Sequence, residues 1–553
     1  MSDFGFVGSA YEASSLTQDA QQLINFYPEI DPTKQMIAGG SVKMDQAQGD
    51  RGVIALYPTP GTNQVAQLDT IAVVRGCHVL PGGSTSIVAC GNILYTLTVG
   101  YSAARIGTLL SSTGPVSITD NGICVYIGDG SNRYFYVINP ISFNGTISGT
   151  TLTVNSVTSG IVYIGMTVSG VGVTAGTTIS SGSGSTWVVN HSQTVGPVAM
   201  TGNQALIVVT DGAFNGASIV DVTDNYIVYN NPNSNQWGCT DVGAITSNAL
   251  NFAATLSAPG NVVGLIADHR QVYLLSEYTT EVWADVGAYP FPFQIIPGST
   301  MQHGCAAAGS IARFGEGFAF LSQDRLGRAT VVLMNGYQPT RISTHAIEEA
   351  INSYPITSDA VAYAYVYAGH AFYVLTFPSA DITWVYDLSS EMWHRRAWRD
   401  SNNILHRHRS NCGMFFGNQQ IVGDYQNGKL YSLVNTAYTD NGDPILRRRR
   451  CQHLTNDLKR VFYSNLQIQF QPGVGNQTSP GTDPKCIISW SDDGGFTFGN
   501  DHVVSIGKVG KYKNRAMIRR LGYGRDRVFN VDIMEPVYTV IVSANLDASV
   551  GVN

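Results

Sequence analysis

The stretch from Asp359 to Trp398 constrains the fold of this chain more than any other. It contains four short runs in which apolar or aromatic residues alternate with small or polar ones, namely AVAYAYVYA, AFYVLTF, ITWVYDL and EMWHRRAW. Period-two alternation in runs rich in Tyr, Val, Phe and Trp is typical of β-strands. Turn residues separate the runs at Gly369-His370, Pro378-Ser379-Ala380 and Leu388-Ser389-Ser390. Four antiparallel strands in about forty residues match the size of one propeller blade.

One such blade cannot fold alone. Burying a large side chain contributes about 1.5–3 kcal/mol, whereas ordering each residue costs about 1.5 kcal/mol. A blade therefore needs neighbours of its own kind, and the same pattern of a turn followed by an aromatic strand recurs. The copies begin at Gly91, Asn121, Asp224, His269, Gly315, Gly369 and Gly417. Most steps fall in the range of propeller repeats. The sequence thus predicts an all-β fold with a β-propeller of six or seven blades; a large sandwich with hairpins at chance spacing is the alternative.

Composition narrows the class of protein. The 553 residues are 44% hydrophobic but only 13% charged, and the net charge is −7. This balance gives no support to a nucleic-acid-binding surface over the whole molecule. The eight cysteines form no C-x-x-C pair, so we expect free, buried thiols in a cytoplasmic setting rather than a zinc ribbon. No signal peptide and no apolar run of 18 residues is present, so we expect no secretion signal and no membrane insertion.

One propeller step is twice too long, between Asn121 and Asp224, and this indicates an insertion. From Tyr134 to Thr210 the chain contains no Asp, Glu, Lys or Arg, and Thr, Val, Gly and Ser alternate there. We predict a small inserted β-sandwich at 141–202 in a blade loop, where insertions are tolerated. Tyr163 and Trp187 are candidate contacts to a glycan or a neighbouring subunit. The alternative is an inert module with Trp187 in its core.

The remaining chain divides by turn chemistry and pattern. We expect an N-terminal arm at 1–50, in which SLTQDAQQLINFYPEID forms either one short helix or an extended arm. The propeller occupies 51–140 and 203–436, and HAIEEAINSY (345–354) is a helix with Thr344 as its N-cap. A turn-rich linker then leads into a C-terminal β-sandwich at 437–553.

The run from Ser491 to Phe498 resembles an Asp-box, S-x-D-x-G-x-T-W, with Phe498 in place of Trp. In that motif the Ser, Asp and Thr side chains bond the backbone of a tight turn, and the aromatic ring packs beneath it. We therefore assign a structural turn, and not catalysis, to Ser491, Asp493, Gly495, Thr497 and Phe498.

Motifs of catalysis are missing from the sequence. It contains no G-x-S-x-G, no H-E-x-x-H, no P-loop and no G-x-G-x-x-G after a strand. His394, His406 and His408 are close in sequence, but their arginine neighbours disfavour a bound cation. We predict a protein that is not an enzyme, with no cofactor and no metal ligands.

Basic residues concentrate after residue 390. The candidate assembly interface consists of Arg395, Arg396, Arg407, Arg409, Arg447, Arg448, Arg449 and Arg450, and further clusters are Lys459-Arg460, Arg515, Arg519, Arg520, Arg525 and Arg527. Three interpretations remain open: an acidic partner subunit, DNA phosphates, or a solvated linker face. Four adjacent arginines at 447–450 repel one another and favour an extended linker. In a strand, Arg447 and Arg449 would share one face and Arg448 and Arg450 the other.

Several short motifs occur in an order that points to one family. They are LINFYPEID near Leu23, ALYPTPGT near Ala55, GNILYTL from Gly91, VSITDNGICVYIGDG from Val116, PTRISTHAIEEAINSY from Pro339, the blade at 359–398, ISWSDDGGFTFG and RRLGYGRDRVFNVDI. In this order they resemble the tail hub, or nozzle, proteins of short-tailed bacteriophages, often called packaged-DNA stabilisation proteins. The resemblance covers most of the chain except the segment near 141–202.

The resemblance implies a structural virion protein. It implies a hexameric ring around the DNA channel that contacts an adaptor ring, fibres or spikes, and a needle or plug. Such a ring closes the channel and retains packaged DNA, and double-stranded DNA passes through its lumen without sequence-specific binding. The implied location is the virion tail, assembled in the host cytoplasm. The alternative function is a propeller-type glycan-binding or glycan-cleaving receptor-binding tail protein.

Overall fold

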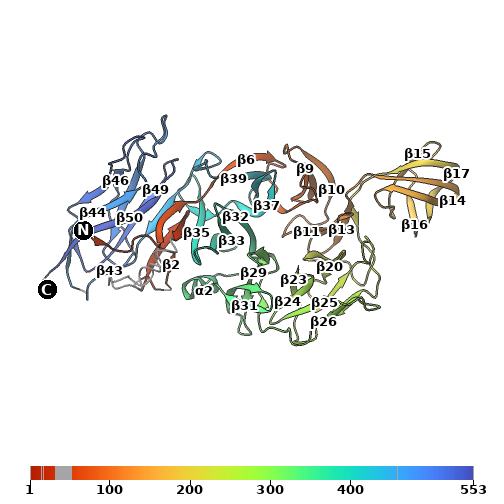
Figure 1. Cartoon of the computed structure of the whole chain (residues 1–553), viewed down its shortest axis with the longest axis horizontal. Helices are drawn as coiled ribbons and strands as arrows, with labels where there is room; N and C mark the ends of the chain where they lie inside the picture. The colour runs from red at the N-terminus through yellow and green to blue at the C-terminus, as the bar shows by residue number, and fades with distance from the viewer. Residues whose placement is uncertain (1, 14, 17, 31–52, 458, 552–553) are drawn as a thin grey trace. The chain divides into compact units, whose positions relative to one another are not determined.

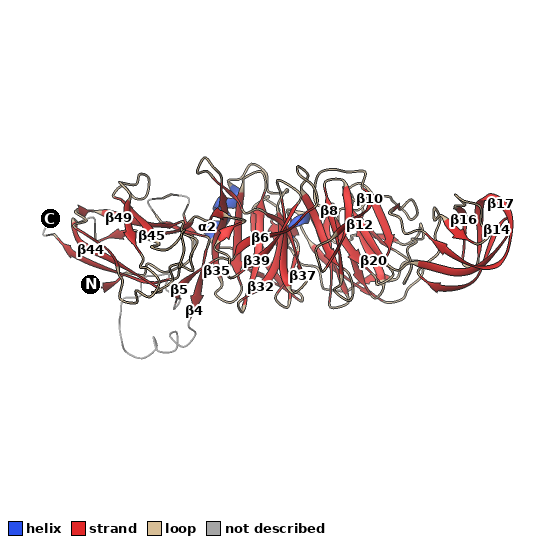
Figure 2. Ribbon diagram, turned by 90° about the horizontal axis from the view of Figure 1, so that it is seen from above, coloured by secondary structure: helices blue, strands red, loops and turns tan. Residues whose placement is uncertain are grey.

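The protein is described here from a computed structural model, which describes all residues except 1, 14, 17, 31–52, 458 and 552–553. Strands dominate the described chain (Figure 2), and its helices are α2 (His345–Asn352) and a short 3-10 turn at Ala308–Ser310. The predicted all-β class is therefore correct. None of the described helices is long and apolar enough to span a membrane.

The chain divides into two compact units, one of which comprises Leu68–Ala308 and Gln323–Arg325. Besides the sheet of the insert, this unit contains four sheets of four antiparallel strands, each built largely from consecutive strands (Figure 1). Their strands are β7–β10 (Val74–Val79, Thr85–Cys90, Ile93–Thr98, Ala103–Thr108), β11–β13 with β18 (Ser117–Asp120, Cys124–Gly128, Arg133–Val137, Ile207–Val208), β19–β22 (Val220–Thr223, Tyr226–Asn230, Gln236–Cys239, Phe252–Ala254) and β23–β26 (Val262–Asp268, Gln271–Ser276, Thr280–Asp285, Phe293–Ile295). These sheets are propeller blades, because apolar residues of adjacent sheets, such as Leu94 and Val125, bury one another.

The other unit comprises Met1–Gln67, Gly309–Ser322 and Leu326–Asn553, and it holds three more blades. Their strands are β28–β31 (Ala312–Phe314, Gly317–Gln323, Ala329–Asn335, Gln338–Arg341), β32–β35 (Val361–Tyr367, His370–Phe377, Ile382–Asp387, Met392–Arg399) and β37–β39 with β6 (Ser410–Phe416, Gln419–Asp424, Lys429–Val434, Gly61–Gln67). The described strands therefore form seven blades, the larger of the two predicted numbers. The alternating stretch from Asp359 to Trp398 forms the blade β32–β35.

Strand β6 completes a blade whose other strands lie more than 340 residues later. It pairs with β39, with Thr62 opposite Leu433. The preceding strand β5 (Val53–Pro58) instead pairs with β4 (Phe26–Ile30) and β50 (Ile541–Val550) in a C-terminal sheet. The propeller therefore begins near residue 61, and the boundary predicted at 51 is too early. The helix α2 begins after Thr344, whose side chain accepts a hydrogen bond from the Ile347 amide, as predicted.

The uncharged insert lies between β13 and β18 of one blade. Its two long strands, β14 (Ile141–Ser159) and β17 (Thr186–Gly202), pair along their length, with Ile141 opposite Gly202. Strands β15 (Val168–Gly170) and β16 (Ile179–Ser183) also pair with β17, which gives one four-stranded sheet. Register shifts interrupt the β14–β17 pairing near Gly145 and Gly149, and the apolar side chains of the sheet form a buried cluster.

The C-terminal region contains two sheets that share strands with the start of the chain. One has the order β4-β5-β50-β44-β47, where β44 is Val461–Phe470 and β47 is Ala516–Arg519. The other contains β42 (Arg447–Arg450), β49 (Asp526–Ile533), β45 (Lys485–Ser491) and β46 (His502–Ser505) in that order. The C-terminal β-sandwich is therefore present, but it includes N-terminal residues.

Strand β3 (Ala20–Ile24) continues the second of these sheets into a propeller blade. It pairs antiparallel with β42 and parallel with β35, so that the order β32-β33-β34-β35-β3-β42-β49-β45-β46 is one hydrogen-bonded sheet. Of the two alternatives for this region, the helix is wrong: Ala20–Ile30 is extended apart from Asn25 between β3 and β4. The rest of the predicted arm, from residue 31, lies outside the described residues.

Candidate functional site

The run Arg447–Arg450 is the interior strand β42 of the joined sheet and not an exposed linker. Its side chains alternate between buried and half-buried, because successive residues of a strand point to opposite faces. Arg447 and Arg449 are fully buried. Since a buried charge is costly unless hydrogen bonds satisfy it, the partners of these guanidinium groups decide what the run does.

Arg449 binds the N-terminal segment. It donates from Nε to the Phe6 carbonyl over 2.6 Å, from Nη1 to the Ser9 carbonyl over 2.9 Å, and from Nη2 to Gln21 Oε1 over 2.8 Å. Arg447 donates to the carbonyl of Tyr438. Burial lowers the pKa of both arginines to about 10, so both stay charged near neutral pH. The three bonds of Arg449 hold Phe6, Ser9 and Gln21 against β42.

The other face of β42 makes different contacts. Arg448 lies directly opposite Asp532 of β49 and donates two hydrogen bonds to its carboxylate, over 2.8 and 2.6 Å. Burial alone would lower the pKa of Arg448, but the bonds to Asp532 outweigh burial and raise it. The Arg450 guanidinium lies 4.4 Å from the centroid of the Phe498 ring.

Asn25 closes the junction where β3 meets β4. Its backbone has a φ of 55°, a left-handed conformation that Asn tolerates better than most residues. Its side-chain amide donates to the carbonyls of Ala397 and Leu446 and accepts from the Ala397 amide. One side chain thus bridges the blade strand β35 and the segment that leads into β42. Sequence reasoning missed this residue, because both partners lie more than 370 positions away.

The other candidate arginines also have partners within the chain. Arg409 pairs with Asp440 over 2.8 Å and Asp443 over 2.7 Å. Arg396 is 1% exposed and lies over the rings of Tyr365 and Phe372. Arg407 and Arg395 are half-buried against Tyr425 and Trp384.

The predicted assembly interface therefore includes fewer arginines than the sequence suggested. Four of its arginines have side chains with little or no exposed surface for a partner, and these are Arg396, Arg409, Arg447 and Arg449. For the four half-buried ones, Arg395, Arg407, Arg448 and Arg450, an assembly contact stays a prediction.

The three neighbouring histidines do not converge on one point. His406 bonds Asp381 over 2.7 Å, and this hydrogen bond raises its pKa. Burial lowers the pKa of His408 to about 3 and that of His394 well below its usual value. Within the described part of the chain, no group of three His, Cys, Asp or Glu residues is arranged to hold a metal ion.

The Asp-box-like run forms the turn that leads from β45 to β46. Ser491 Oγ donates to Asp493 Oδ1 over 2.5 Å and accepts from the Gly495 amide over 2.8 Å. Asp493 also accepts from the Phe496 and Thr497 amides and the Thr497 hydroxyl. The Ser491 and Thr497 hydroxyls hold the pKa of the Asp493 carboxyl well below its usual range. The bonds stay within the turn, and Phe498 contacts Arg450 of the junction.

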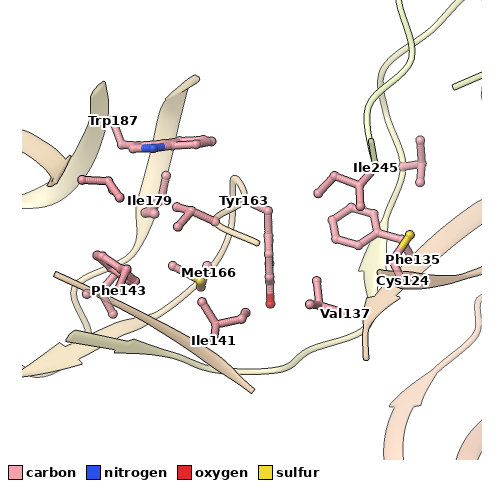
Figure 3. Close-up of a cluster of buried hydrophobic side chains, with 14 of the residues drawn as sticks. Cys124, Phe135, Val137, Ile141, Phe143, Tyr163, Met166, Ile179, Trp187 and Ile245 are labelled. Carbon is pink, nitrogen blue, oxygen red and sulfur yellow. The ribbon is translucent and has the colours of Figure 1, made fainter. Parts of the chain in front are cut away.

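Tyr163 and Trp187 are interior residues of the insert. They are 2% and 7% exposed, so neither ring is a flat surface platform for stacking. Tyr163 donates to the Asn203 carbonyl over 2.8 Å and meets the Phe135 ring edge-to-face at 5.3 Å. Figure 3 shows Tyr163 between the insert side chains and Phe135 and Val137 of the blade. Both rings also line an apolar cavity of about 570 Å³, so contact with a ligand or neighbour there stays a prediction.

Two family models match consecutive parts of the chain. A model of phage stabilisation proteins, described as "Bacteriophage P22 Gp10, beta-propeller", matches residues 142–438. A second, "Bacteriophage P22 Gp10, beta-sandwich", matches residues 447–549. The chain belongs to the bacteriophage P22 Gp10 family. The matched regions correspond to blades and sandwich as the structure has them, although the propeller match begins inside the insert and omits β6, the blade β7–β10 and the strands β11–β13.

Solved structures add little to this assignment. The chain is similar to the WD40 β-propeller domain of Doa1, at 9% identity and a TM-score of 0.35, over 68% of this chain and 98% of that one. It is also similar to the Pan2 WD40 domain of Neurospora crassa, at 8% identity and a TM-score of 0.34, over 68% and 97%. No curated protein matched. At these scores the alignments carry no argument about function.

Proposed function

We propose that this member of the P22 Gp10 family is a non-enzymatic structural protein that forms the ring-shaped tail hub, or nozzle, of a short-tailed phage. The ring closes the DNA channel and retains packaged DNA until ejection. The observation that carries this proposal is the pair of family matches, propeller first and sandwich second, which together span most of the chain.

The junction around β42 suits such a role. A subunit that holds back packaged DNA must resist displacement of its sandwich from its blades. In this chain, one hydrogen-bonded sheet runs from blade to sandwich through β3, and Asn25 and Arg449 fasten both sides with buried hydrogen bonds. Buried polar networks that are satisfied in this way favour a single, rigid arrangement.

The proposed partners follow from the same role. The chain forms a hexameric ring that joins an adaptor ring to a needle or plug and to fibres or spikes, with double-stranded DNA in its lumen. Among the arginines, Arg395, Arg407, Arg448 and Arg450 remain the candidates for contacts between subunits. The ring is assembled in the host cytoplasm, is part of the virion tail, and needs no cofactor.

Native mass spectrometry and negative-stain microscopy of the purified chain test this proposal. The expected result is a ring with a lumen, with the mass of a hexamer of the 59.4 kDa chain. A ring that forms only with the adaptor protein present also agrees. A monomer or trimer that binds lipopolysaccharide with and without the adaptor would contradict the proposal and favour a receptor-binding tail protein.

A further inference from the structure

The segment from Lys508 to Arg525 carries a concentration of positive charge. Seven of its residues are Lys or Arg, and no Asp or Glu lies between Asp501 and Asp526. The segment therefore contributes +7 to a chain whose net charge is −7, which leaves −14 on the remaining residues. Such a concentration creates a local positive potential on an otherwise acidic molecule.

These cations are exposed. Lys508, Lys511, Lys513 and Arg515 are exposed in the loop before β47, and Arg519 and Arg520 are exposed at its end. Among the described residues, no carboxylate oxygen lies within 4.0 Å of the charged nitrogens of these six side chains. Within the described part of the chain, their charge is therefore not neutralised by a carboxylate. In this they differ from the arginines of β42, whose guanidinium groups contact other residues of the same chain.

Strand pairing brings further cations to the same place. Both β47 and β48 (Tyr523–Gly524) pair with β44, with Arg519 opposite Asn465 and Tyr523 opposite Phe462. Arg460, just before β44, lies with its guanidinium 5.0 Å from the Tyr523 ring centroid. Lys459, Arg460 and Arg525 are exposed as well. We call the exposed Lys and Arg side chains of 459–460 and 508–525 the basic edge.

Aromatic rings accompany these charges. Tyr512 is 72% exposed and Tyr523 is 55% exposed. An exposed tyrosine within a basic surface can donate its hydroxyl hydrogen to a phosphate oxygen, as arginine and lysine donate theirs.

An acidic surface on a second copy of the chain fits this edge less well. The unit comprising Leu68–Ala308 has an excess of carboxylates, but its own backbone occupies several of them. Glu281 accepts hydrogen bonds from the Leu256 and Ser257 amides, and Asp221 accepts from the Ala267 amide. A polymer of phosphates presents unpaired charges at regular spacing, which better matches the exposed loop cations Lys508, Lys511, Lys513 and Arg515.

We propose that the basic edge binds the phosphate backbone of duplex DNA without reading its sequence. This inference rests on the proposed function, since a tail hub meets the packaged DNA. Phosphate binding by several Lys and Arg side chains releases condensed counterions. The affinity should therefore fall steeply with salt, with a slope of log K against log salt of about −0.9 for each phosphate neutralised.

Fluorescence anisotropy of the full chain with a labelled, random-sequence DNA duplex tests the proposal. Between 50 and 200 mM NaCl we expect an affinity loss of about 10²–10³-fold, which corresponds to about five phosphate contacts. Replacing Lys508, Lys511, Lys513 and Arg515 by Gln should reduce the magnitude of the salt slope by about 3–4. These four side chains lie in an exposed loop, so circular dichroism should stay unchanged.

A matched control removes the same number of exposed charges elsewhere, by Arg105→Gln, Arg270→Gln, Arg325→Gln and Lys485→Gln, and should keep the wild-type slope. Absence of binding at 50 mM NaCl, or an equal loss in both variants, would overturn the proposal. Loss of self-association by the loop variant, with unchanged DNA binding, would assign the edge to an acidic protein surface instead. Native mass measured on the same samples separates the two proposals, because rings that bind no DNA contradict only this one.

Discussion

The insert at 141–202 and the junction around β42 both attach β structure to propeller blades, but by opposite means. The insert enters and leaves through adjacent paired strands, and apolar contacts such as Tyr163 against Phe135 join it to its blade. The junction brings together Leu23 and Arg449, more than 420 residues apart, and fastens them with buried arginines. The first attachment is local and uncharged, whereas the second is long-range and depends on charge.

This difference shows what each attachment contributes. A module that is connected to its blade through one pair of strands can be deleted with little effect on the topology of the blade. A strand that supplies the middle of a sheet cannot be lost in the same way, because both of its neighbours, β35 and β42, would become edges with unpaired backbone groups. The largest effects of mutation should therefore fall in the junction.

The largest effect is expected for Arg449→Met. This change removes the guanidinium group that donates hydrogen bonds to the Phe6 and Ser9 carbonyls and to Gln21 Oε1. Because each hydrogen bond to a charged group contributes about 1.5–3 kcal/mol, the free energy of unfolding should fall by at least about 3 kcal/mol. Urea unfolding followed by circular dichroism measures the change. Arg448→Met, whose Asp532 partner keeps access to water, should cost less; an equal or smaller loss for Arg449→Met would contradict the junction.

Removal of the insert should have a smaller effect. Replacing Ser142–Thr201 with a short Gly-Ser linker keeps the two ends together, since Ile141 lies opposite Gly202. Phe135 and Val137 of the blade then become more exposed to solvent. The free energy of unfolding should fall by about 1.5–3 kcal/mol for each side chain that becomes fully exposed. We expect a soluble protein with one cooperative melting transition. Aggregation with loss of the β signal in circular dichroism would show that the insert is part of the blade core.

The two attachments should also differ in their response to pH. Burial would lower the pKa of His370, but its hydrogen bonds to Asp387 and to Glu29 of β4 outweigh burial and raise it. A raised folded-state pKa means that protonated His370 stabilises the fold below its unfolded pKa. That contribution is lost as the pH rises through the folded pKa.

Thermal melts from pH 5 to pH 9 measure this effect, and His370→Gln should remove it. The insert carries no Asp, Glu, Lys or Arg. In a His191→Gln variant, which removes the one histidine of the insert, hydrogen exchange of the β14 amides, corrected for the intrinsic exchange rate, should therefore not change over the same range. The comparison between the two attachments would be reversed if hydrogen exchange depended on pH in β14 but not in β4.

The smallest effect is expected at the Asp-box-like turn. Asp493→Ala removes the acceptor of the Phe496 and Thr497 amides in a turn that is exposed to solvent, where water replaces lost partners. We expect a lower melting temperature than the wild type, with a shift well below that of Arg449→Met. Asp493→Asn, which retains an acceptor oxygen, should lower the melting temperature by less than Asp493→Ala does. A change in binding of DNA or glycan at an unchanged melting temperature would refute a purely structural turn.

Local pattern was enough to predict much of the fold. Alternation between Asp359 and Trp398 predicted the blade β32–β35, Thr344 marked the start of α2, and the uncharged run predicted an inserted β module. Each of these signals lies within a few tens of residues. The role of β3 could not be predicted in this way, because Ala20–Ile24 alternates too briefly and its partners lie in distant strands.

The alternation of the run Arg447–Arg450 indicated a strand, but its charge pointed to an exposed linker instead. Its alternation along a strand was anticipated, but repulsion between neighbours suggested an extended linker. The structure instead places Arg449 against carbonyl oxygens and Arg448 against Asp532, and neither partner is close in sequence. Tyr163 was a candidate contact to a glycan or a neighbouring subunit, and its burial could not be predicted for a related reason. The blade residue Phe135 that contacts it precedes the insert, and an uncharged module gave no polar face to orient it.

Hydrogen exchange of the β3 amides in the purified, unassembled chain tests the central claim, that β3 joins blade and sandwich within one subunit. We expect Leu23 and Ile24 to exchange as slowly as their partners in β42 and as Val531 in β49. We also expect Arg449→Met to accelerate exchange in β3 more than in the blade strand β33. Exchange of β3 at the rate of exposed loops, with protection appearing only after ring assembly, would show that β3 does not join blade and sandwich within one subunit and would make β42 a contact between subunits.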